Sequence, residues 1–339
     1  MKTIKLILAL TTYLTTNICF AEEVKTIKGF TMGNSYNIKW KEKKISANRM
    51  HHINTKVKAK LTELNETMSS WDNNSELSLL NNSKEKQFNI SPDLEYVISE
   101  AIRIHHVTHG ALDITVDPLI SLWGFGATDR EYNVPSHTDI SKTLKFVGMD
   151  KINVADGALT RTSTKVTLNL SSIAKGFAVD AVTIILEKNH IKDYLVDIGG
   201  EIRLNGTNLN NKSWNVGIDK PFAYSTGQIE IVKLKNRAIA TSGNYRKYFE
   251  SNGKHYSHII NPKNGQPVEY KIVSATVIAE RCMTADGFAT AFMVLPVKQS
   301  LDIANKHNIP VMLIEDKFGK LITHYSVPFN RIQEKQLKM

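Results

Sequence analysis

The chain has 339 residues, of which 42% are hydrophobic, and 43 Lys and Arg against 33 Asp and Glu give a formal net charge of +10 at pH 7. This length and hydrophobic content suffice for one large domain or for two that pack closely together. The positive charge either forms a solvated surface or attracts anionic ligands. The sequence has no basic-aromatic stripe and no nucleic-acid-binding module, so we expect no nucleic acid as a partner.

Residues 1–21 have the pattern of a secretory signal peptide. Lys2 and Lys5 begin the segment, a mostly apolar run follows, and Ala21 ends it just before two glutamates. The apolar run is too short and too rich in threonine for a convincing membrane span. We therefore expect cleavage after Ala21, which leaves residues 22–339 as the mature, exported protein.

Cys19 supports an alternative fate for this segment, in which lipidation or a retained anchor associates the protein with the inner membrane. Ile18 favours cleavage instead, because a lipidation site normally has a small residue immediately before its cysteine. Cleavage also removes Cys19 and leaves Cys282 as the only cysteine, so that no internal disulfide can form.

Two helices are predicted in the first part of the mature chain. The first follows from apolar residues at helical spacing, at Val57, Leu61, Leu64 and Met68. The second begins at Ser91-Pro92-Asp93, where a capping serine precedes a proline in the first turn, and Gly110 fits its end.

Further along, the chain switches between strand and helix signals. Residues 195–198 and 201–204 read as the two strands of a hairpin around the turn Gly199-Gly200. Residues 272–279 favour a strand and lead into a helix from about Ala285. Because strands and helices mix without a strict βαβ alternation, we predict an α+β fold.

Residues 166–176 have the features of a phosphate-binding turn. An apolar, strand-like run ends at Leu170, and Ser171-Ser172 can cap a helix that begins just before Lys175. Free backbone amides, two hydroxyls and a positive charge together suit a bound phosphate. Many strand-to-helix turns share this pattern, so its meaning depends on the other segments.

Asp286 and Thr290 stand four residues apart, which puts a carboxylate and a hydroxyl on one face of a helix, one turn apart. Both supply hard oxygen ligands of the kind that Mg²⁺ prefers, and phosphates and water commonly complete its coordination shell. The alternative is purely structural, with an Asp near a helix start and a Thr that faces a neighbour.

His258 precedes an apolar pair and a turn at residues 261–265. A histidine here can serve as general base or phosphate partner, since imidazole titrates near neutral pH. The alternative is an ordinary histidine, one of eleven in the chain.

Trp71 follows the first predicted helix and is either part of the core or a flat platform for an aromatic ring system. The sequence has no P-loop and no strand-linked GxGxxG motif, which argues against an ATPase or an ordinary nicotinamide dehydrogenase. It also has no Cys/His cluster that suggests zinc.

Taken in chain order, these segments resemble the ApbE family, the FAD:protein FMN transferases. One such motif would be weak, but eight in family order identify the chain as a member. The matching segments are residues 31–36, the Trp71 segment, 110–116, 170–180, 196–201, 240–246, the His258 segment and 285–290.

The resemblance implies an α+β fold of the ApbE type, with mixed sheets and packed helices in a single compact catalytic unit. It also implies FAD as substrate and Mg²⁺ as the metal, with His258 and Asp286 as catalytic residues. The implied metal ligands are the Ala174 carbonyl, Asp286 and Thr290. The implied FAD contacts are Met32, Trp71, Ala111, Leu112, Asp113, Ser171, Phe177 and, as a backbone contact, Ile260. Within this family pattern Lys175 becomes a less secure phosphate ligand.

Four positions depart from the family pattern. Trp71 stands where tyrosine is common, which keeps a stacking ring and removes a hydroxyl. Asn244 and Asn261 replace frequent aspartates, and Ala289 stands where some members have another aspartate. These differences bear on the number of bound metal ions more than on the type of reaction.

The implied reaction is Mg²⁺-dependent transfer of FMN from FAD to a Thr or Ser hydroxyl of an acceptor protein, through a phosphoester bond and with release of AMP. The resemblance points to a periplasmic enzyme whose acceptors are subunits of NADH:quinone oxidoreductase or RNF-type redox complexes. Two alternatives stay open. One is an Mg²⁺-dependent FAD pyrophosphatase that yields FMN and AMP, and the other is a periplasmic FAD-binding protein without turnover.

Overall fold

The predicted signal peptide, residues 1–21, and Tyr245-Arg246 of the predicted motif lie outside the part of the chain that the structure describes. Across the described part, no helix is both long and apolar enough to cross a membrane. This computed structural model describes residues 22–43, 45–127, 132–221, 227–244, 248–268 and 272–337.

A large antiparallel sheet forms the centre of the fold. Within the described residues it has eight strands in the order β1-β2-β6-β7-β10-β13-β14-β15, and each strand runs antiparallel to its neighbour. The strands are β1 (Glu23–Thr31), β2 (Asn34–Glu42), β6 (Tyr194–Ile198), β7 (Glu201–Asn205), β10 (Arg237–Gly243), β13 (Ile272–Ala279), β14 (Val311–Lys317) and β15 (Lys320–Tyr325).

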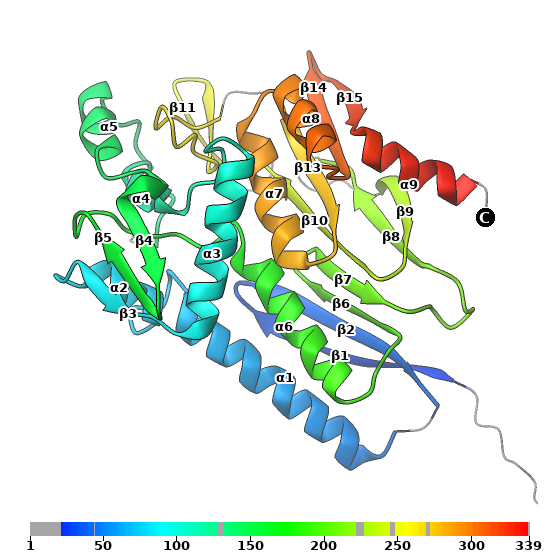
Figure 1. Cartoon of the computed structure of the whole chain (residues 1–339). Coiled ribbons are helices and arrows are strands. Elements are labelled where there is room, and N and C mark those ends of the chain that lie inside the picture. Colours follow the sequence, from blue (N-terminus) through cyan, green and yellow to red (C-terminus); the bar gives the residue numbers. More distant parts are fainter. Residues whose placement is uncertain are drawn as a thin grey trace, which may run out of the picture.

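Helices cover one face of this sheet, and together they bury the main hydrophobic core (Figure 1). The stripe predicted from Val57 to Met68 is buried on the longest of them, which confirms that prediction. The next confirmed feature is the Ser91 cap, whose Oγ accepts a hydrogen bond of 3.3 Å from the Leu94 amide. These helices are α1 (Ala47–Met68), α3 (Pro92–Val107), α6 (Ala174–Lys188) and α7 (Cys282–Val294).

The opposite face of the sheet packs against a second hydrophobic cluster. Two strands, β8 (Trp214–Asp219) and β9 (Gln228–Leu234), pair with each other there, and α9 (Val327–Leu337) contributes Phe329 to the same cluster. Successive side chains of β10 alternate between the two faces, as a strand requires. Ile239 therefore belongs to this second cluster, while its neighbours in the chain belong to the helix-covered core.

Shorter elements lie beside α3 (Figure 1). A third hydrophobic cluster around Trp123 joins some of them, and the Trp123 indole donates a 2.8 Å hydrogen bond to the Gly265 carbonyl. The short elements are α2 (Glu76–Asn82), β3 (Gln87–Asn89), η1 (Ile114–Val116), α4 (Asp117–Leu122), α5 (His137–Leu144), η2 (Met149–Lys151), β4 (Ile152–Ala155), β5 (Ala158–Arg161), β11 (Tyr248–Ser251) and β12 (Lys254–Ser257); α8 (Val297–Lys306) packs on β14.

The mixture of sheets and helices confirms the α+β prediction, and the glycine hairpin is also confirmed. Ile198 pairs with Glu201 across Gly199-Gly200, and both glycines have positive φ, as a tight hairpin turn requires. Two boundaries differ from prediction. The helix expected to stop at Gly110 ends at Val107, and the helix expected from about Ala285 begins at Cys282.

The strand predicted up to Leu170 does not form. Leu168 is buried as its alternating pattern requires, but its backbone N–H and C=O bond to the side chain of Asn81, both at 2.8 Å, in place of a neighbouring strand. The helix cap predicted for Ser171-Ser172 is also wrong. The residue at the cap position of α6 is Ile173, and its side chain makes no capping hydrogen bond.

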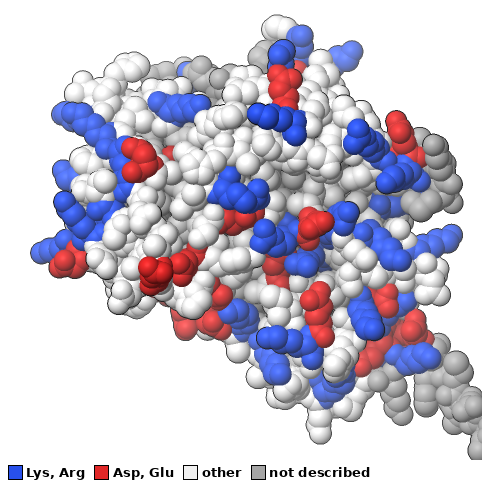
Figure 2. Space-filling model, in the orientation of Figure 1, with Lys and Arg blue, Asp and Glu red and all other residues white. Residues whose placement is uncertain are grey.

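The excess of positive charge does not gather into a single continuous region on the face that Figure 2 draws. Lys and Arg side chains there are interspersed with Asp and Glu over much of the surface. On this face, positive and negative side chains are therefore mixed.

Candidate active site

A cavity of about 710 Å³ collects the predicted residues from distant parts of the chain. Its walls include two hairpin turns of the large sheet, the start of α6, one side of α7 and the loops that follow α1, α3 and β12. Every predicted site residue except Phe177 lines it: Met32, Trp71, Ala111, Leu112, Asp113, Ser171, Ala174, His258, Ile260, Asp286 and Thr290.

Met32 reaches the cavity from the turn between β1 and β2. Met32 and Gly33 both have positive φ, of 48° and 72°, so this turn places a methionine in a conformation that L residues rarely adopt. The Asn34 side chain holds the turn by donating a 2.8 Å hydrogen bond to the Met32 carbonyl. The Gly199 amide in turn donates to the Ser35 carbonyl at 3.0 Å, which brings both hairpin turns to the same wall.

Trp71 lies on the rim of the cavity, and 68% of its surface is exposed. The core role that the sequence left open is therefore excluded. A large aromatic side chain that borders a cavity without being packed away can stack on a flat ring.

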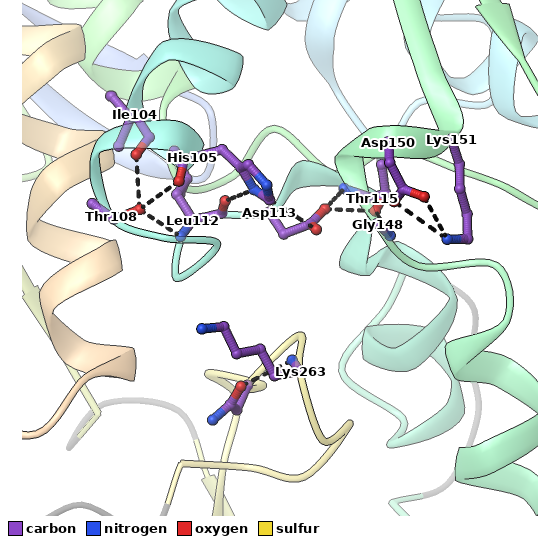
Figure 3. Close-up of polar contacts among 11 residues, drawn as sticks. Ile104, His105, Thr108, Leu112, Asp113, Thr115, Gly148, Asp150, Lys151 and Lys263 are labelled. Carbon is purple, nitrogen blue, oxygen red and sulfur yellow. Dashed lines mark hydrogen bonds and ion pairs between the residues drawn. The ribbon is translucent and has the colours of Figure 1, made fainter.

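The Asp113 side chain closes another wall, at the end of the loop that follows α3. Its Oδ1 accepts hydrogen bonds from the backbone and the hydroxyl of Thr115, at 2.8 and 2.5 Å (Figure 3). His105 lies on its other side and bonds to the Leu112 carbonyl at 2.8 Å. Burial raises the pKa of Asp113, and the bonds from Thr115 oppose that rise. A second, more open cavity of about 450 Å³ adjoins it at Asp113, with Lys263 on its far side.

Ser171 is held on the cavity wall by a chain of side-chain hydrogen bonds. Asn169 Oδ1 accepts from both the amide and the hydroxyl of Ser171, at 3.1 and 2.6 Å. The Asn169 amide group then donates to partly buried Asp117 at 3.2 Å. This arrangement positions the first residue after the apolar run, although that run is not a strand.

His258 and Ile260 project from a tight loop that is closed by backbone hydrogen bonds. The Asn261 amide donates to the Gln266 carbonyl at 2.8 Å, and the Gly265 amide donates to the Asn261 carbonyl at 2.8 Å. The His258 ring meets Phe125 edge-on, with 6.3 Å between ring centroids. The loop therefore fixes an imidazole on the cavity wall.

Asp286 and Thr290 line the cavity from one side of α7, and Ala174 lines it as the first residue of α6. The Thr290 hydroxyl pairs with the Ser242 hydroxyl at 3.0 Å. Among the described residues, no three His, Cys, Asp or Glu side chains are grouped to hold a metal ion. A carboxylate, a hydroxyl and a backbone carbonyl instead form a mixed set of hard oxygen donors, which fits Mg²⁺ when phosphates supply further ligands.

Charged groups surround Asp286 closely. Burial and, next, repulsion from Glu201 raise the pKa of Asp286 to about 8. Lys175 pairs with the second of these acids, with its Nζ 2.6 Å from Glu201 Oε1. Burial alone would lower the pKa of Lys175, but Glu201 and Asp286 outweigh it and raise that pKa, so the ammonium group stays charged.

Phe177 is the exception among the predicted contacts. Its side chain does not line the cavity and is buried with its ring centroid 5.9 Å from that of Tyr96 on α3. A contact between this ring and a ligand in the cavity is therefore not available in this structure.

Several cavity residues were missed or underrated at the level of sequence. Glu201 is only 3% exposed, and its Oε2 has no hydrogen-bond partner in the described structure. Its position directly after Gly199-Gly200 was the available signal, because the hairpin turn brings the start of β7 to the cavity wall. Lys175 lines the cavity as well, although its ammonium group is already paired with Glu201. Asn34, Asn169 and Ser242 also line the cavity, and none of them was assigned a role from the sequence.

Comparison with known proteins places this cavity in a family. The protein-family model for the ApbE family matches residues 32–313, which make up most of the chain. The chain belongs to the ApbE family. It is 38% identical to the FAD:protein FMN transferase of Haemophilus influenzae over 319 residues, covering 92% of each protein. It is also 38% identical to the enzyme of the same name from Vibrio cholerae, covering 91% of this chain and 93% of that protein.

Solved structures of the ApbE family agree with this fold. The flavin transferase ApbE from Vibrio cholerae superposes with a TM-score of 0.84 at 36% identity, over 91% of this chain and 99% of the other. The apo form of the flavinyl transferase ApbE from Pseudomonas stutzeri gives a TM-score of 0.84 at 29% identity, over 92% and 98% of the two chains. The ApbE-type fold predicted for this chain is therefore confirmed.

The departures from the ApbE pattern have structural counterparts. Ala289 is completely buried, so a carboxylate there would need both space and a partner. Asn261 uses its side chain to accept a 3.0 Å hydrogen bond from the Lys263 amide and so shapes the loop behind His258. Asn244 donates to the Ile272 carbonyl at 3.3 Å.

Proposed function

We propose that this protein transfers FMN from FAD to a Thr or Ser hydroxyl of an acceptor protein in an Mg²⁺-dependent reaction. The observation that carries the proposal is the convergence of Trp71, His258 and the Asp286–Thr290 pair on one cavity. A stacking surface, a proton acceptor and a set of oxygen ligands are the parts that a flavin dinucleotide and its pyrophosphate would need. The names of the relatives support the same activity.

Two groups of cavity residues have different tasks in this mechanism. Trp71 and Met32 would hold ring systems of FAD, while Asp113 and Ser171 offer polar contacts. Asp286, Thr290 and the Ala174 carbonyl would hold Mg²⁺ beside the pyrophosphate. When bound, Mg²⁺ offsets negative charge on the phosphate oxygens during transfer. Positioning and electrostatics supply most of the rate enhancement in such reactions.

His258 is the residue that we assign to the proton. The acceptor hydroxyl oxygen bonds to the FMN phosphorus, and the bond from that phosphorus to the bridging oxygen breaks. AMP leaves with the bridging oxygen, and the imidazole of His258 takes the hydroxyl proton. Asp286 would assist the same step by holding the Mg²⁺ ion beside the phosphates.

The predicted signal peptide supports the compartment in this proposal, and the family resemblance supports the acceptor. Residues 1–21 would direct the protein to the periplasm. The segment would then either be cleaved or remain as an anchor at the inner membrane. Periplasmic domains of NADH:quinone oxidoreductase or RNF-type complexes are then the acceptor subunits. Covalent attachment suits that compartment, because a flavin that dissociates there is not readily replaced.

Incubation of the mature protein with FAD, MgCl₂ and a candidate acceptor domain tests the function directly. Flavin fluorescence that stays on the denatured acceptor, with release of AMP, is the expected result. Soluble FMN and AMP without labelled acceptor would instead identify a pyrophosphatase, and unchanged FAD would identify a binding protein.

Asp286→Asn tests the metal assignment in the same assay, because it keeps the size of the side chain and removes its charge. We expect Mg²⁺-dependent transfer to be lost. Asp193→Asn is the matched control, because Asp193 caps a remote turn through the Thr207 amide at 2.6 Å and does not line the cavity. Near wild-type transfer by Asp286→Asn would contradict the assignment.

A further inference from the structure

Both helices that carry the proposed metal ligands begin without a cap of their own. The cap residues are Ile173 for α6 and Arg281 for α7, and neither side chain accepts a hydrogen bond from its helix. The first amides of a helix have no partner within that helix, and such amides need partners when they are buried. The missing acceptors therefore come from elsewhere in the fold.

Each helix receives its cap from a carboxylate of the other. Asp286 on α7 accepts a hydrogen bond of 2.9 Å from the Gly176 amide in the first turn of α6. Asp180 on α6 accepts from the amides of Cys282 and Met283 at the start of α7, both at 3.0 Å. Asp180 and Asp286 are both buried. We call this pair of contacts the reciprocal cap.

Arg203 on β7 fixes one half of the reciprocal cap from the sheet. Its guanidinium donates to Asp180 Oδ1 at 2.7 Å, to the same oxygen that accepts from Cys282. The Asp180 carboxylate thus accepts hydrogen bonds from one side chain and two backbone amides. An acid with three such donors has a single fixed orientation.

We propose that Asp180, held by Arg203, is a positioning residue for the metal site. This inference rests on the proposed assignment of Asp286 and Thr290 as ligands. Asp180 fixes where α7 begins relative to α6, and this sets the distance between the Asp286 and Thr290 side chains and the start of α6 at Ala174. Asp180 does not line the cavity, so it positions the ligands through these helices. Its charge also acts on Asp286 through space, and the variants below separate the two effects.

The Asp180→Asn variant breaks the arrangement with little change in volume. An asparagine amide has only one acceptor oxygen. Its nitrogen, which is a donor, would therefore face another donor, either a backbone amide of α7 or the guanidinium of Arg203. Ser91→Ala is the matched control, because it removes the cap of α3, which carries no proposed metal ligand. Arg203→Gln is a second variant, which removes the ion pair with Asp180 and changes no residue that caps α6 or α7.

The test measures Mn²⁺ binding to the FAD-loaded protein by electron paramagnetic resonance and calorimetry, without acceptor. Circular dichroism and FAD affinity show that each variant is folded. We expect Asp180→Asn to bind Mn²⁺ about 10- to 100-fold more weakly, the range found for residues that orient metal ligands. Ser91→Ala should lower the melting temperature and leave Mn²⁺ affinity unchanged.

Arg203→Gln separates positioning from through-space charge. Loss of a nearby positive charge would by itself tighten binding of a cation, whereas loss of orientation weakens it. Weaker Mn²⁺ binding by Arg203→Gln supports the inference, and unchanged or tighter binding overturns it. Wild-type Mn²⁺ affinity in folded Asp180→Asn overturns it as well. If the wild-type protein itself binds no Mn²⁺, the proposed metal site fails together with this inference.

Discussion

Asp286 Oδ2 accepts a hydrogen bond from the Gly176 amide, although 110 residues separate the two in the chain. The same carboxylate lines the cavity and is a proposed cation ligand, so it joins the start of α6 to the metal site. The positive end of the α6 dipole lies at Gly176 and favours a negative charge at Asp286. Burial and repulsion from Glu201 act against that charge.

Gly176→Ala should disrupt this junction. A Cβ at Gly176 would lie 2.5 Å from the Cys282 carbonyl oxygen and 2.7 Å from Met283 Cα, both of them backbone atoms that cannot rotate away. We expect the free energy of unfolding to fall by about 1–3 kcal/mol, as in other overpacked cores. Urea unfolding measures the change.

Gly287→Ala is the control for this substitution within α7. Its new Cβ would lie 2.6 Å from Ile104 Cδ1, the end of a flexible side chain, and alanine favours the helix by about 1 kcal/mol. We expect it to be less destabilising than Gly176→Ala. Equal losses from the two variants would contradict a special role for the approach of Gly176 to Cys282.

Features that depend on neighbouring residues were predictable from the sequence. The buried stripe of α1 follows from a period close to 3.6 residues, and the start of α3 follows from Ser91-Pro92. The turn at Gly199-Gly200 follows from two residues that tolerate positive φ. In each case the physical cause lies within a few positions of the signal.

Features that depend on distant partners were not predictable in this way. The alternating run that ends at Leu170 looks like a strand, but the side chain of Asn81 takes the backbone hydrogen bonds that a neighbouring strand would have made. The predicted serine cap of α6 failed because Asp286 supplies the cap from another helix. Family motifs predicted which residues meet at the cavity, but not how these helices hold them.

Trp71→Ala should weaken FAD binding without unfolding the protein. The ring is 68% exposed, so its loss should change stability by no more than about 0.5 kcal/mol. Loss of stacking on a flat ring costs about 1–3 kcal/mol, which corresponds to a dissociation constant for FAD about 5- to 150-fold higher. Flavin fluorescence titration measures it. Trp71→Tyr should keep most of the affinity, and wild-type affinity in Trp71→Ala would exclude the stacking role.

Met32 allows the effects of backbone and side chain to be separated. Its φ of 48° costs an L residue about 1–2 kcal/mol, a cost that glycine does not have. Met32→Gly should therefore be more stable than Met32→Ala in thermal unfolding. Both variants should lose FAD affinity to a similar extent, because both remove the same side chain from the cavity. Equal stability of the two would show that the turn is not strained at this position.

Glu100 gives a prediction for the dependence of stability on pH. This buried side chain on α3 accepts hydrogen bonds from Arg103 at 2.8 and 2.7 Å and from the Thr284 hydroxyl of α7 at 2.5 Å. Burial alone would raise the pKa of Glu100, but Arg103, Thr284 and Arg281 outweigh it and lower the pKa below its usual 4.5. The stabilisation is therefore complete above pH 4.5 and is lost as the pH falls through the lowered value.

Glu100→Gln should reduce the free energy of unfolding by about 1.5–3 kcal/mol at pH 7, the usual contribution of a hydrogen bond to a charged group. The difference from wild type should shrink as the pH falls below 4.5, because the wild-type carboxylate then becomes protonated. Urea unfolding at several pH values between 7 and 3.5 measures both effects. Glu63→Gln is the control, since Glu63 is 59% exposed and its pairing with Lys60 should contribute little. A difference for Glu100→Gln that stays constant over the whole pH range would show that the charge of Glu100 is not what joins α3 to α7.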